Sequence, residues 1–216
     1  MEQYQKIQTV FYRDPDNNYK TLLKDKFSLP EFKFLKDNEW VWTEKIDGTN
    51  IRVIYDGYNT TFKGKTDKAV IPQPLLLKLN ELFTSHQMNT TFIDEEDDDV
   101  NICLYGEGYG AKIQSGGGYI PNGNNFILFD CKVNNIWLNR DSLEDIAISL
   151  NIDIVPIIGT GRLMEAVNFV EKGFMSKISD NKDLIAEGLV LKPSVELKDR
   201  KGNRIISKIK YKDFKR

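Results

Sequence analysis

Short runs rich in aromatic and β-branched residues predict several β-strands along the chain. Residues 40–45 read Trp-Val-Trp-Thr-Glu-Lys, and residues 50–55 read Asn-Ile-Arg-Val-Ile-Tyr, and both runs are typical of strands. The Asp47-Gly48 pair between them is typical of a hairpin turn, so these two segments are predicted to pair. Similar runs predict further strands at residues 100–107, 126–130, 154–158, 185–192 and 204–210. Residues 1–39 are polar, contain Pro15 and Pro30, and are predicted to be rich in loops.

Three segments have the spacing of helices. Between residues 74 and 88, one helical face collects apolar residues that are expected to pack in the core, namely Leu75, Leu76, Leu79, Leu82 and Phe83. Asp141 and Glu144 resemble a capping box that begins a helix ending near Leu150. A third helix is predicted at residues 163–174. Because strands outnumber helices and hairpins outnumber strand–helix–strand units, the predicted fold class is α+β with largely antiparallel sheets.

Composition narrows the class of protein. The 216 residues are 40% hydrophobic, which is enough for one substantial core, so a single domain over residues 1–216 is predicted. Two cysteines, Cys103 and Cys131, exclude a disulfide framework, and with one histidine they cannot build a zinc site by themselves. Since the sequence has no apolar run of about 18 residues and no secretory signal, a soluble cytoplasmic protein is predicted.

Positive charge is concentrated near the carboxyl terminus. The formal net charge is −2, but residues 198–216 hold nine Lys or Arg and two Asp, a net charge of +7 that leaves −9 for the remainder. Such a segment is a candidate phosphate-binding edge, while charge alone favours a solvated tail. The acidic run at residues 94–99 is predicted to be a solvated loop and not a metal site.

Two nucleotide-binding motifs are only partly matched. Gly64-Lys65-Thr66 resembles the end of a P-loop, but Asn59 stands where that motif requires its earlier glycine. Gly106 to Ala111 fits the spacing of a dinucleotide fingerprint, but the glycine-rich residues that follow cannot form the helix this fingerprint must open. Neither a P-loop nor a Rossmann domain is predicted.

Five short elements carry the candidate chemistry, in a fixed order along the chain. Lys45 precedes the Asp47-Gly48 turn, and Glu107 and Glu187 each precede a glycine next to an apolar strand. Phe129 offers an aromatic face beside Asp130. Lys208 and Lys210 share one face of a strand, because side chains at i and i+2 project together. Each element alone is weak evidence, since surface hairpins, ion-paired acids and solvated edge strands give the same patterns.

This ordered set resembles the covalent nucleotidyltransferase superfamily of ATP-dependent ligases and mRNA capping enzymes. The spacings and residues 109–117 are similar to those of the RNA ligase 2 family within it. The resemblance implies an ATP-grasp-like nucleotidyltransferase domain with flanking helices. Because the sequence ends six residues after Lys210, no OB-type domain is expected. The resemblance also implies that the protein uses ATP with Mg²⁺ or Mn²⁺ and acts on RNA, as nicked duplex or bridged ends. Separately, a monomer is expected.

The same resemblance implies a role for each candidate residue. Lys45 would attack the α-phosphate of ATP, and because an ordinary lysine with a pKa near 10.4 is almost fully protonated at pH 7, it needs cationic neighbours. Lys208 and Lys210 would supply these charges as further catalytic residues. Glu107 would bind the ribose, Phe129 would stack on adenine, and Glu187 would place the metal. Other nucleotide-binding candidates are Glu44, Ile46, Asn50 and Lys65.

Two alternatives remain at this stage. The first is a nucleotidyltransferase with another acceptor, such as DNA ends or a capping-type enzyme that uses GTP. The second is a non-catalytic domain that binds RNA or a protein. One departure from the family concerns Lys65, which stands where these ligases often carry an arginine and cannot form a bidentate fork on phosphate.

Overall fold

The chain folds into two compact units, each built from separate stretches of sequence. The computed structural model describes residues 3–93, 100–114 and 118–215. The first unit is Asp47–Val155 with the amino-terminal residues up to Tyr4, and the second is Gln5–Ile46 with Pro156–Arg216. Within the described residues, no helix is both long and apolar enough to cross a membrane. Each unit has its own sheet and its own hydrophobic core.

The first unit contains a six-stranded sheet in the order β10-β8-β7-β5-β6, with β9 paired to β8. Neighbouring strands are antiparallel, apart from the parallel pair β8 and β10. The strands are β5 (Thr49–Tyr55), β6 (Thr60–Lys63), β7 (Ile102–Gly110), β8 (Asn124–Val133), β9 (Ile136–Trp137) and β10 (Asp153–Ile154).

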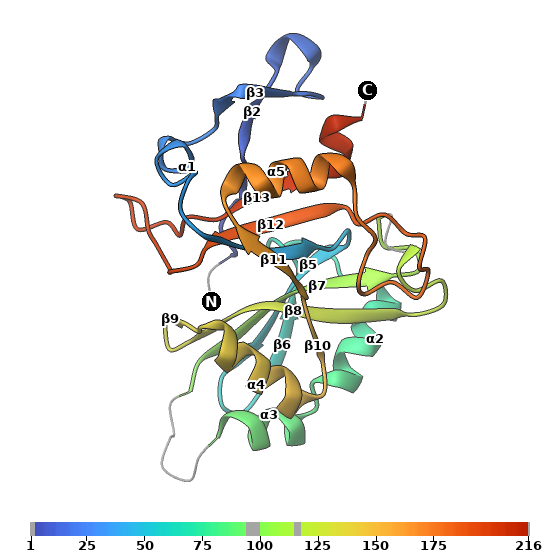
Figure 1. Ribbon diagram of the computed structural model, residues 1–216. Helices are drawn as coiled ribbons and strands as arrows, with labels where there is room; N and C mark the ends of the chain where they lie inside the picture. Colours follow the sequence, from blue (N-terminus) through green and yellow to red (C-terminus); the bar gives the residue numbers. More distant parts are fainter. Residues whose placement is uncertain (1–2, 94–99, 115–117, 216) are drawn as a thin grey trace. The chain divides into compact units, whose positions relative to one another are not determined.

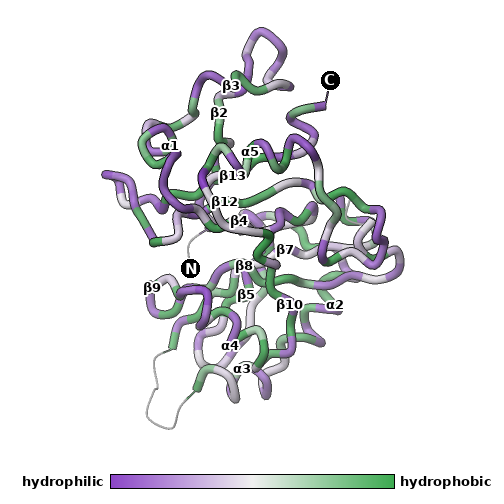
Figure 2. The backbone as a smooth tube through the Cα atoms, in the orientation of Figure 1, coloured by the Kyte–Doolittle hydropathy of each residue, from purple (hydrophilic) through white to green (hydrophobic). Residues whose placement is uncertain are grey.

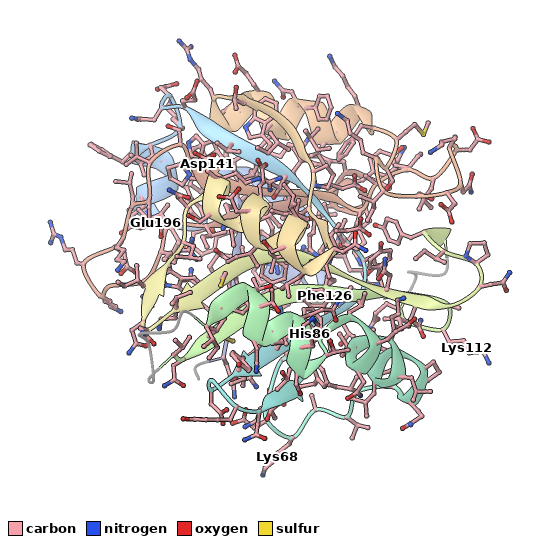
Figure 3. The ribbon with its side chains drawn as sticks, turned by 90° about the horizontal axis from the view of Figure 1, so that it is seen from below. Lys68, His86, Lys112, Phe126, Asp141 and Glu196 are labelled. Carbon is pink, nitrogen blue, oxygen red and sulfur yellow. The ribbon has the colours of Figure 1, made fainter. Side chains whose placement is uncertain are left out.

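Three helices cover one face of this sheet (Figure 1). They are α2 (Gln73–Leu82), α3 (Ser85–Phe92) and α4 (Arg140–Leu150). Figure 3 shows Phe126 between these helices and the strands, with His86 on α3 and Asp141 on α4. Alternate residues of β5, β7 and β8 point into this core, so their remaining side chains lie on the opposite face of the sheet.

The second unit contains a five-stranded sheet in the order β1-β13-β12-β4-β11. Only β1 and β13 run parallel within it. Helix α5 (Leu163–Lys172) packs its apolar face on this sheet, and Figure 2 shows the alternation of hydrophobic and hydrophilic positions along it. The strands are β1 (Gln8–Thr9), β4 (Trp40–Lys45), β11 (Ile157–Gly161), β12 (Gly188–Pro193) and β13 (Ser207–Lys210). Smaller elements are the pair β2 (Phe11–Arg13) and β3 (Leu22–Phe27), α1 (Pro30–Phe34), η1 (Pro15–Asn17) and η3 (Tyr211–Phe214).

The structure confirms the α+β class and the largely antiparallel sheets, but not the hairpin at Asp47-Gly48. β4 pairs with β11 and β12, whereas β5 pairs with β6 and β7 in the other sheet. The turn therefore leads the chain from one sheet to another. A glycine is required in it because a Cβ at Gly48 would lie 2.3 Å from the carbonyl oxygen of Gly108.

Three further predictions of elements are wrong in detail. Residues 154–158 form parts of two strands in different sheets, because Pro156 has no N–H to continue a ladder. Residues 74–88 belong to two helices, since Thr84 caps the second by accepting a hydrogen bond from the Gln87 backbone. Helix α4 is capped by Asn139, not by Asp141, although it ends at Leu150 as predicted.

The amino-terminal segment is more regular than predicted. Residues 1–39 were expected to be mostly loops, yet the described part contains β1, β2, β3 and α1. These strands are stabilised by pairing with distant partners, such as β13 for β1, which the local sequence does not reveal. The acidic run at residues 94–99 lies outside the described residues.

Candidate active site

Lys45 is the last residue of β4 and lies on the face of the sheet opposite the α5 core. Trp40, Trp42 and Glu44 alternate with it and are buried, so the pattern of β4 directs Lys45 the other way. The Lys45 side chain is 19% exposed. Its ammonium group donates a hydrogen bond of 3.3 Å to the carbonyl oxygen of Ile46. Lys45 is thus a largely covered cation at a strand end.

Glu187 joins two lysines with one carboxylate group. Its Oε2 lies 2.7 Å from the Lys45 Nζ, and its Oε1 lies 2.5 Å from the Lys210 Nζ. The Glu187 side chain is 9% exposed. The Tyr211 backbone donates a 2.8 Å hydrogen bond to the Glu187 carbonyl, which fixes the main chain just before β12. The three charged groups therefore form one bridged cluster.

Gly188 explains why the two lysines can meet over the central strand. It pairs with Lys45 on one side and Lys210 on the other, so the three residues form one row across the sheet. Gly188 has φ +155°, and a Cβ there would lie 2.1 Å from the carbonyl oxygen of Ile209. A side chain at this position is excluded, which leaves room for Lys45 and Lys210 to approach Glu187.

Lys208 lies in the next row of the same sheet. It pairs with Val190, which pairs in turn with Thr43, and it is two residues from Lys210 on the same face of β13. The predicted sharing of one face by the two lysines is therefore seen in the strand geometry. Three lysines from two strands lie on one side of this sheet.

Glu44 points away from this cluster. Its Oε1 accepts a 2.5 Å hydrogen bond from the Ser176 hydroxyl, and its Oε2 accepts a 2.8 Å bond from the Lys177 backbone N–H. The residue is 1% exposed, and burial raises the pKa of the carboxyl above 4.5 against the opposing effect of both hydrogen bonds. Glu44 therefore ties the loop after α5 to the end of β4.

Of the five remaining candidates, Ile46 is a buried residue of the second unit directly after β4, and the other four belong to the first unit. Asn50 on β5 pairs with Glu107 on β7, and both lie on the face of the sheet away from the helices. The side-chain oxygen of Asn50 is buried and has no hydrogen-bond partner among the described residues. A buried acceptor without a partner costs free energy, so its presence calls for an explanation.

Phe129 lies at a β-bulge in β8. Tyr105 pairs with Asp130 and Gly106 pairs with Leu128, which leaves Phe129 as the extra residue. Bulges of this kind re-aim a side chain. Tyr4 packs edge-on against Phe129 with ring centroids 5.1 Å apart, and its hydroxyl donates a 2.7 Å hydrogen bond to Asp130. No pattern in the sequence around Tyr4 predicted its contacts with Phe129 and Asp130.

Lys65 is exposed on the loop after β6, and a buried arginine that the sequence analysis missed contacts this loop. The Nη2 atom of Arg52 lies 2.7 Å from Asp67 Oδ1, and its Nε donates to the carbonyl oxygen of Gly64 at 3.1 Å. An arginine inside the apolar run of residues 51–55 was the available signal.

Clustered metal ligands and reactive thiols are not seen in the described ranges. No group of three or more His, Cys, Asp or Glu residues is placed to hold a metal ion there. Both cysteines are buried and unpaired, and burial raises the pKa of each thiol. Glu187 is a single carboxylate flanked by lysines, so it fits a cation only if bound phosphates and water supply the other ligands.

Solved structures of an RNA ligase from Naegleria gruberi share this fold. A variant with ATP and manganese matches with a TM-score of 0.63 and 18% identity, covering 96% of this chain and 58% of the ligase. A variant with AMP and manganese matches with a TM-score of 0.62 and 17% identity, covering 94% and 56%. The enzyme with pyrophosphate matches with a TM-score of 0.63 and 18% identity, covering 94% and 56%. The chain thus spans less than two thirds of the length of these ligases.

Comparison with sequence families assigns the chain to a family more directly than the structural matches do. No curated protein has a significantly similar sequence. The profile of the RNA ligase family, in contrast, matches residues 38–211, a range that includes every candidate site residue in both units. Because this match covers most of the chain, the protein belongs to the RNA ligase family.

Proposed function

We propose that the protein is an ATP-dependent RNA ligase of the RNA ligase 2 type, with Lys45 as the nucleophile that accepts AMP. The observation that carries the proposal is the cluster of Lys45, Glu187 and Lys210, joined at 2.7 and 2.5 Å. A surface hairpin or solvated edge strand gives no reason to hold two ammonium groups on one nearly buried carboxylate. Phosphoryl chemistry does, because it needs a fixed amine and neighbouring positive charge.

In the first step, the neutral amine of Lys45 attacks the α-phosphate of ATP. An N–P bond forms, the bond from the α-phosphorus to the bridging oxygen breaks, and pyrophosphate leaves with that electron pair, while the attacking nitrogen releases its proton to water. Glu187 holds the amine in position before the reaction, and Lys210 and Lys208 offset the negative charge that develops on the phosphates. AMP then passes to the 5′-phosphate of an RNA, and a 3′-hydroxyl displaces it to join the strands.

Glu187 is also the proposed ligand for a divalent cation. Mg²⁺ in nucleotide sites is usually held by one or two carboxylates together with substrate phosphates and water, and a lone carboxylate satisfies this requirement. The cation, Mg²⁺ or Mn²⁺, would neutralise the departing pyrophosphate. The Naegleria gruberi structures with ATP or AMP and manganese support this choice of ligands.

Nucleoside recognition is assigned to the first unit. Glu107 is proposed to bind the ribose and Phe129 to stack on adenine, with Asn50 as a neighbouring polar contact. The buried, unpartnered oxygen of Asn50 beside Glu107 supports a role in binding. In the second unit, both side-chain oxygens of Glu44 accept hydrogen bonds from Ser176 and Lys177, so a nucleotide contact by Glu44 would involve its backbone atoms. A polar contact by Ile46 would also involve backbone atoms, because its side chain is apolar.

The proposed RNA partner accounts for part of the basic segment. The hairpin tip after β12 is exposed and hydrophilic (Figure 2) and carries Lys198, Arg200 and Lys201. Arg204 is instead paired with Glu196 and is buried. Exposed cations at this tip would contact phosphates without reading sequence. A single nucleotidyltransferase domain over residues 1–216 that acts as a monomer completes the proposal.

Strand sealing tests this proposal directly. The protein is incubated with ATP, Mg²⁺ and a nicked duplex labelled at a 5′-phosphate, made either of RNA or of DNA. The proposal expects joined RNA and an AMP-capped RNA intermediate. Joining of DNA alone, or transfer of GMP from GTP to a diphosphate end, would assign another acceptor. Binding of RNA without any joining or AMP transfer would show a non-catalytic domain.

A further inference from the structure

The buried carboxylate of Asp213 is bonded to the residue that ends β13. Its Oδ2 accepts a 3.3 Å hydrogen bond from the backbone N–H of Lys210. Its Oδ1 accepts a 2.7 Å bond from the Nη2 of Arg13 on β2, and the Asp213 side chain is 2% exposed. The Nη1 of Arg13 donates in turn to the carbonyl oxygen of Tyr19 at 3.2 Å. Asp213 therefore links β2 to the main chain of Lys210, whose ammonium group contacts Glu187.

Strand pairing explains why the N–H of Lys210 is bonded to a side chain. The Tyr211 N–H donates to the carbonyl oxygen of Glu187 at 2.8 Å. Lys210 and Gly188, which adjoin these two residues, are therefore a non-hydrogen-bonded pair, and the Lys210 N–H points away from β12. On that other side lies β1, whose pairing reaches no farther along β13 than Lys208. The Asp213 carboxylate thus supplies the acceptor that a longer β1 would provide.

The turn that carries Asp213 is itself held in place. It is η3, the carboxyl-terminal turn that lies beside α5 (Figure 1). The Tyr211 ring packs so closely on Gly173, at the end of α5, that an added Cβ there would lie 2.8 Å from Tyr211 Cε2. Tyr211 and Phe214 also pack against the hydrophobic core of the second unit. The position of Asp213 is therefore set by contacts other than its bond to Lys210.

We propose that Asp213, held by Arg13, is a positioning residue for Lys210 in the proposed active site. This inference rests on the proposed function. A lysine ammonium lies at the end of a flexible four-carbon stem, so its reach depends on where the main chain is held. Catalytic groups need support that fixes them within about 0.5 Å. By fixing the end of β13, Asp213 keeps the Lys210 ammonium at Glu187, where it can offset the negative charge that develops on the phosphates.

Single-turnover formation of lysyl-AMP separates positioning from stability. The variants are Asp213→Asn, which removes the charge, and Arg13→Lys, which keeps the cation. The control is Glu196→Gln, which removes a carboxylate paired with the buried Arg204 in the same unit. Rate constant and amplitude are measured separately over a range of ATP concentrations, and thermal unfolding monitors the fold. Unfolded molecules form no adduct and lower the amplitude, whereas a misplaced Lys210 lowers the rate constant.

Asp213→Asn is expected to lower the maximal rate constant about tenfold and to change the half-saturating ATP concentration by less than about twofold, because Lys210 acts on charge that develops during the reaction. Arg13→Lys can no longer bond both Asp213 and the Tyr19 carbonyl, so a loss of about threefold is expected. This second variant carries the test if Asp213→Asn does not fold. Glu196→Gln should keep the parental rate constant.

Parental rate constants in the variants that fold, with or without a loss of amplitude, would overturn the inference. An effect confined to the half-saturating ATP concentration, or an equal loss of rate in Glu196→Gln, would also overturn it. Failure of the proposed function is distinguishable, because the parent chain itself would then form no lysyl-AMP, and the inference would fall with it.

Discussion

The Lys45 ammonium lies 2.7 Å from Glu187 Oε2, although the two residues are 142 positions apart in the sequence. The contact depends on the pairing of β4 with β12, which places Gly188 opposite Lys45. The second oxygen of the same carboxylate reaches Lys210 on the other neighbouring strand. The two ion pairs of Glu187 therefore depend on the register of three neighbouring strands and on the absence of a side chain at Gly188.

The first prediction concerns Gly188, which must be a glycine. Gly188→Ala is expected to destabilise the protein by about 2–4 kcal/mol, because the new Cβ meets backbone atoms that cannot move independently. Gly202→Ala is the matched control, since Gly202 also has positive φ (+84°) but no atom within 4 Å of the added Cβ. It should cost about 1 kcal/mol. Chemical denaturation measures both, and equal losses would contradict the steric account.

The second prediction tests Glu187 as an active-site group. Glu187→Gln preserves the shape of the side chain but removes its charge, and it should slow lysyl-AMP formation about 100-fold. It should also raise the Mg²⁺ concentration needed for half-maximal rate, because a metal ligand is lost. Glu171→Gln, which removes an exposed carboxylate paired with Lys24, is the control. Single-turnover rates that do not separate the two variants would remove Glu187 from the chemistry.

Much of this site was predictable from the sequence, because its motifs are local. The strand predicted at residues 40–45 ends at Lys45, as β4 does, and the spacing of Lys208 and Lys210 placed them on one face of β13. Strand pairing was not predictable. The Asp47-Gly48 turn has the local chemistry of a hairpin, but the partners of β4 and β5 are set by strands far away in sequence.

Residues held by long-range contacts were missed for the same reason. Tyr4 contacts Phe129 and Asp130 from the other end of the first unit's sequence, and no periodic pattern marks it. Arg52 is buried within an apolar run, where its partner Asp67 is visible only in three dimensions. The hydrogen bond from Ser176 to Glu44 likewise joins segments 132 positions apart.

The third prediction uses the corrected start of α4. Asn139→Ala removes the side chain that accepts a 2.9 Å hydrogen bond from the Ser142 backbone, and it should cost about 1 kcal/mol of stability. Asp141→Ala, at the residue that the sequence pattern favoured as the cap, should cost clearly less. Urea denaturation of the two variants decides between the positions. A larger loss of stability for Asp141→Ala than for Asn139→Ala would instead support Asp141 as the capping residue.

The fourth prediction concerns pH and Glu44. Because burial raises the folded-state pKa of Glu44 above its ordinary value of 4.5, the folded protein binds more protons than the unfolded chain just above pH 4.5. The Glu44 contribution to stability therefore falls as pH rises through this range. Glu44→Gln removes the titration, so its stability relative to the parent should increase as pH rises from 4.5. Unfolding free energies that differ by a constant amount at every pH would contradict the shift.

Intact-protein mass after incubation with ATP and Mg²⁺ tests the central claim most directly. The parent chain is measured beside Lys45→Ala, and a portion is first treated with pyrophosphate to remove any AMP already bound covalently. The account predicts a gain of one AMP by the parent, reversed by pyrophosphate, and no gain by Lys45→Ala. An adduct on both proteins would place the nucleophile elsewhere, and no adduct on the pyrophosphate-treated parent would contradict the proposed lysyl-AMP chemistry.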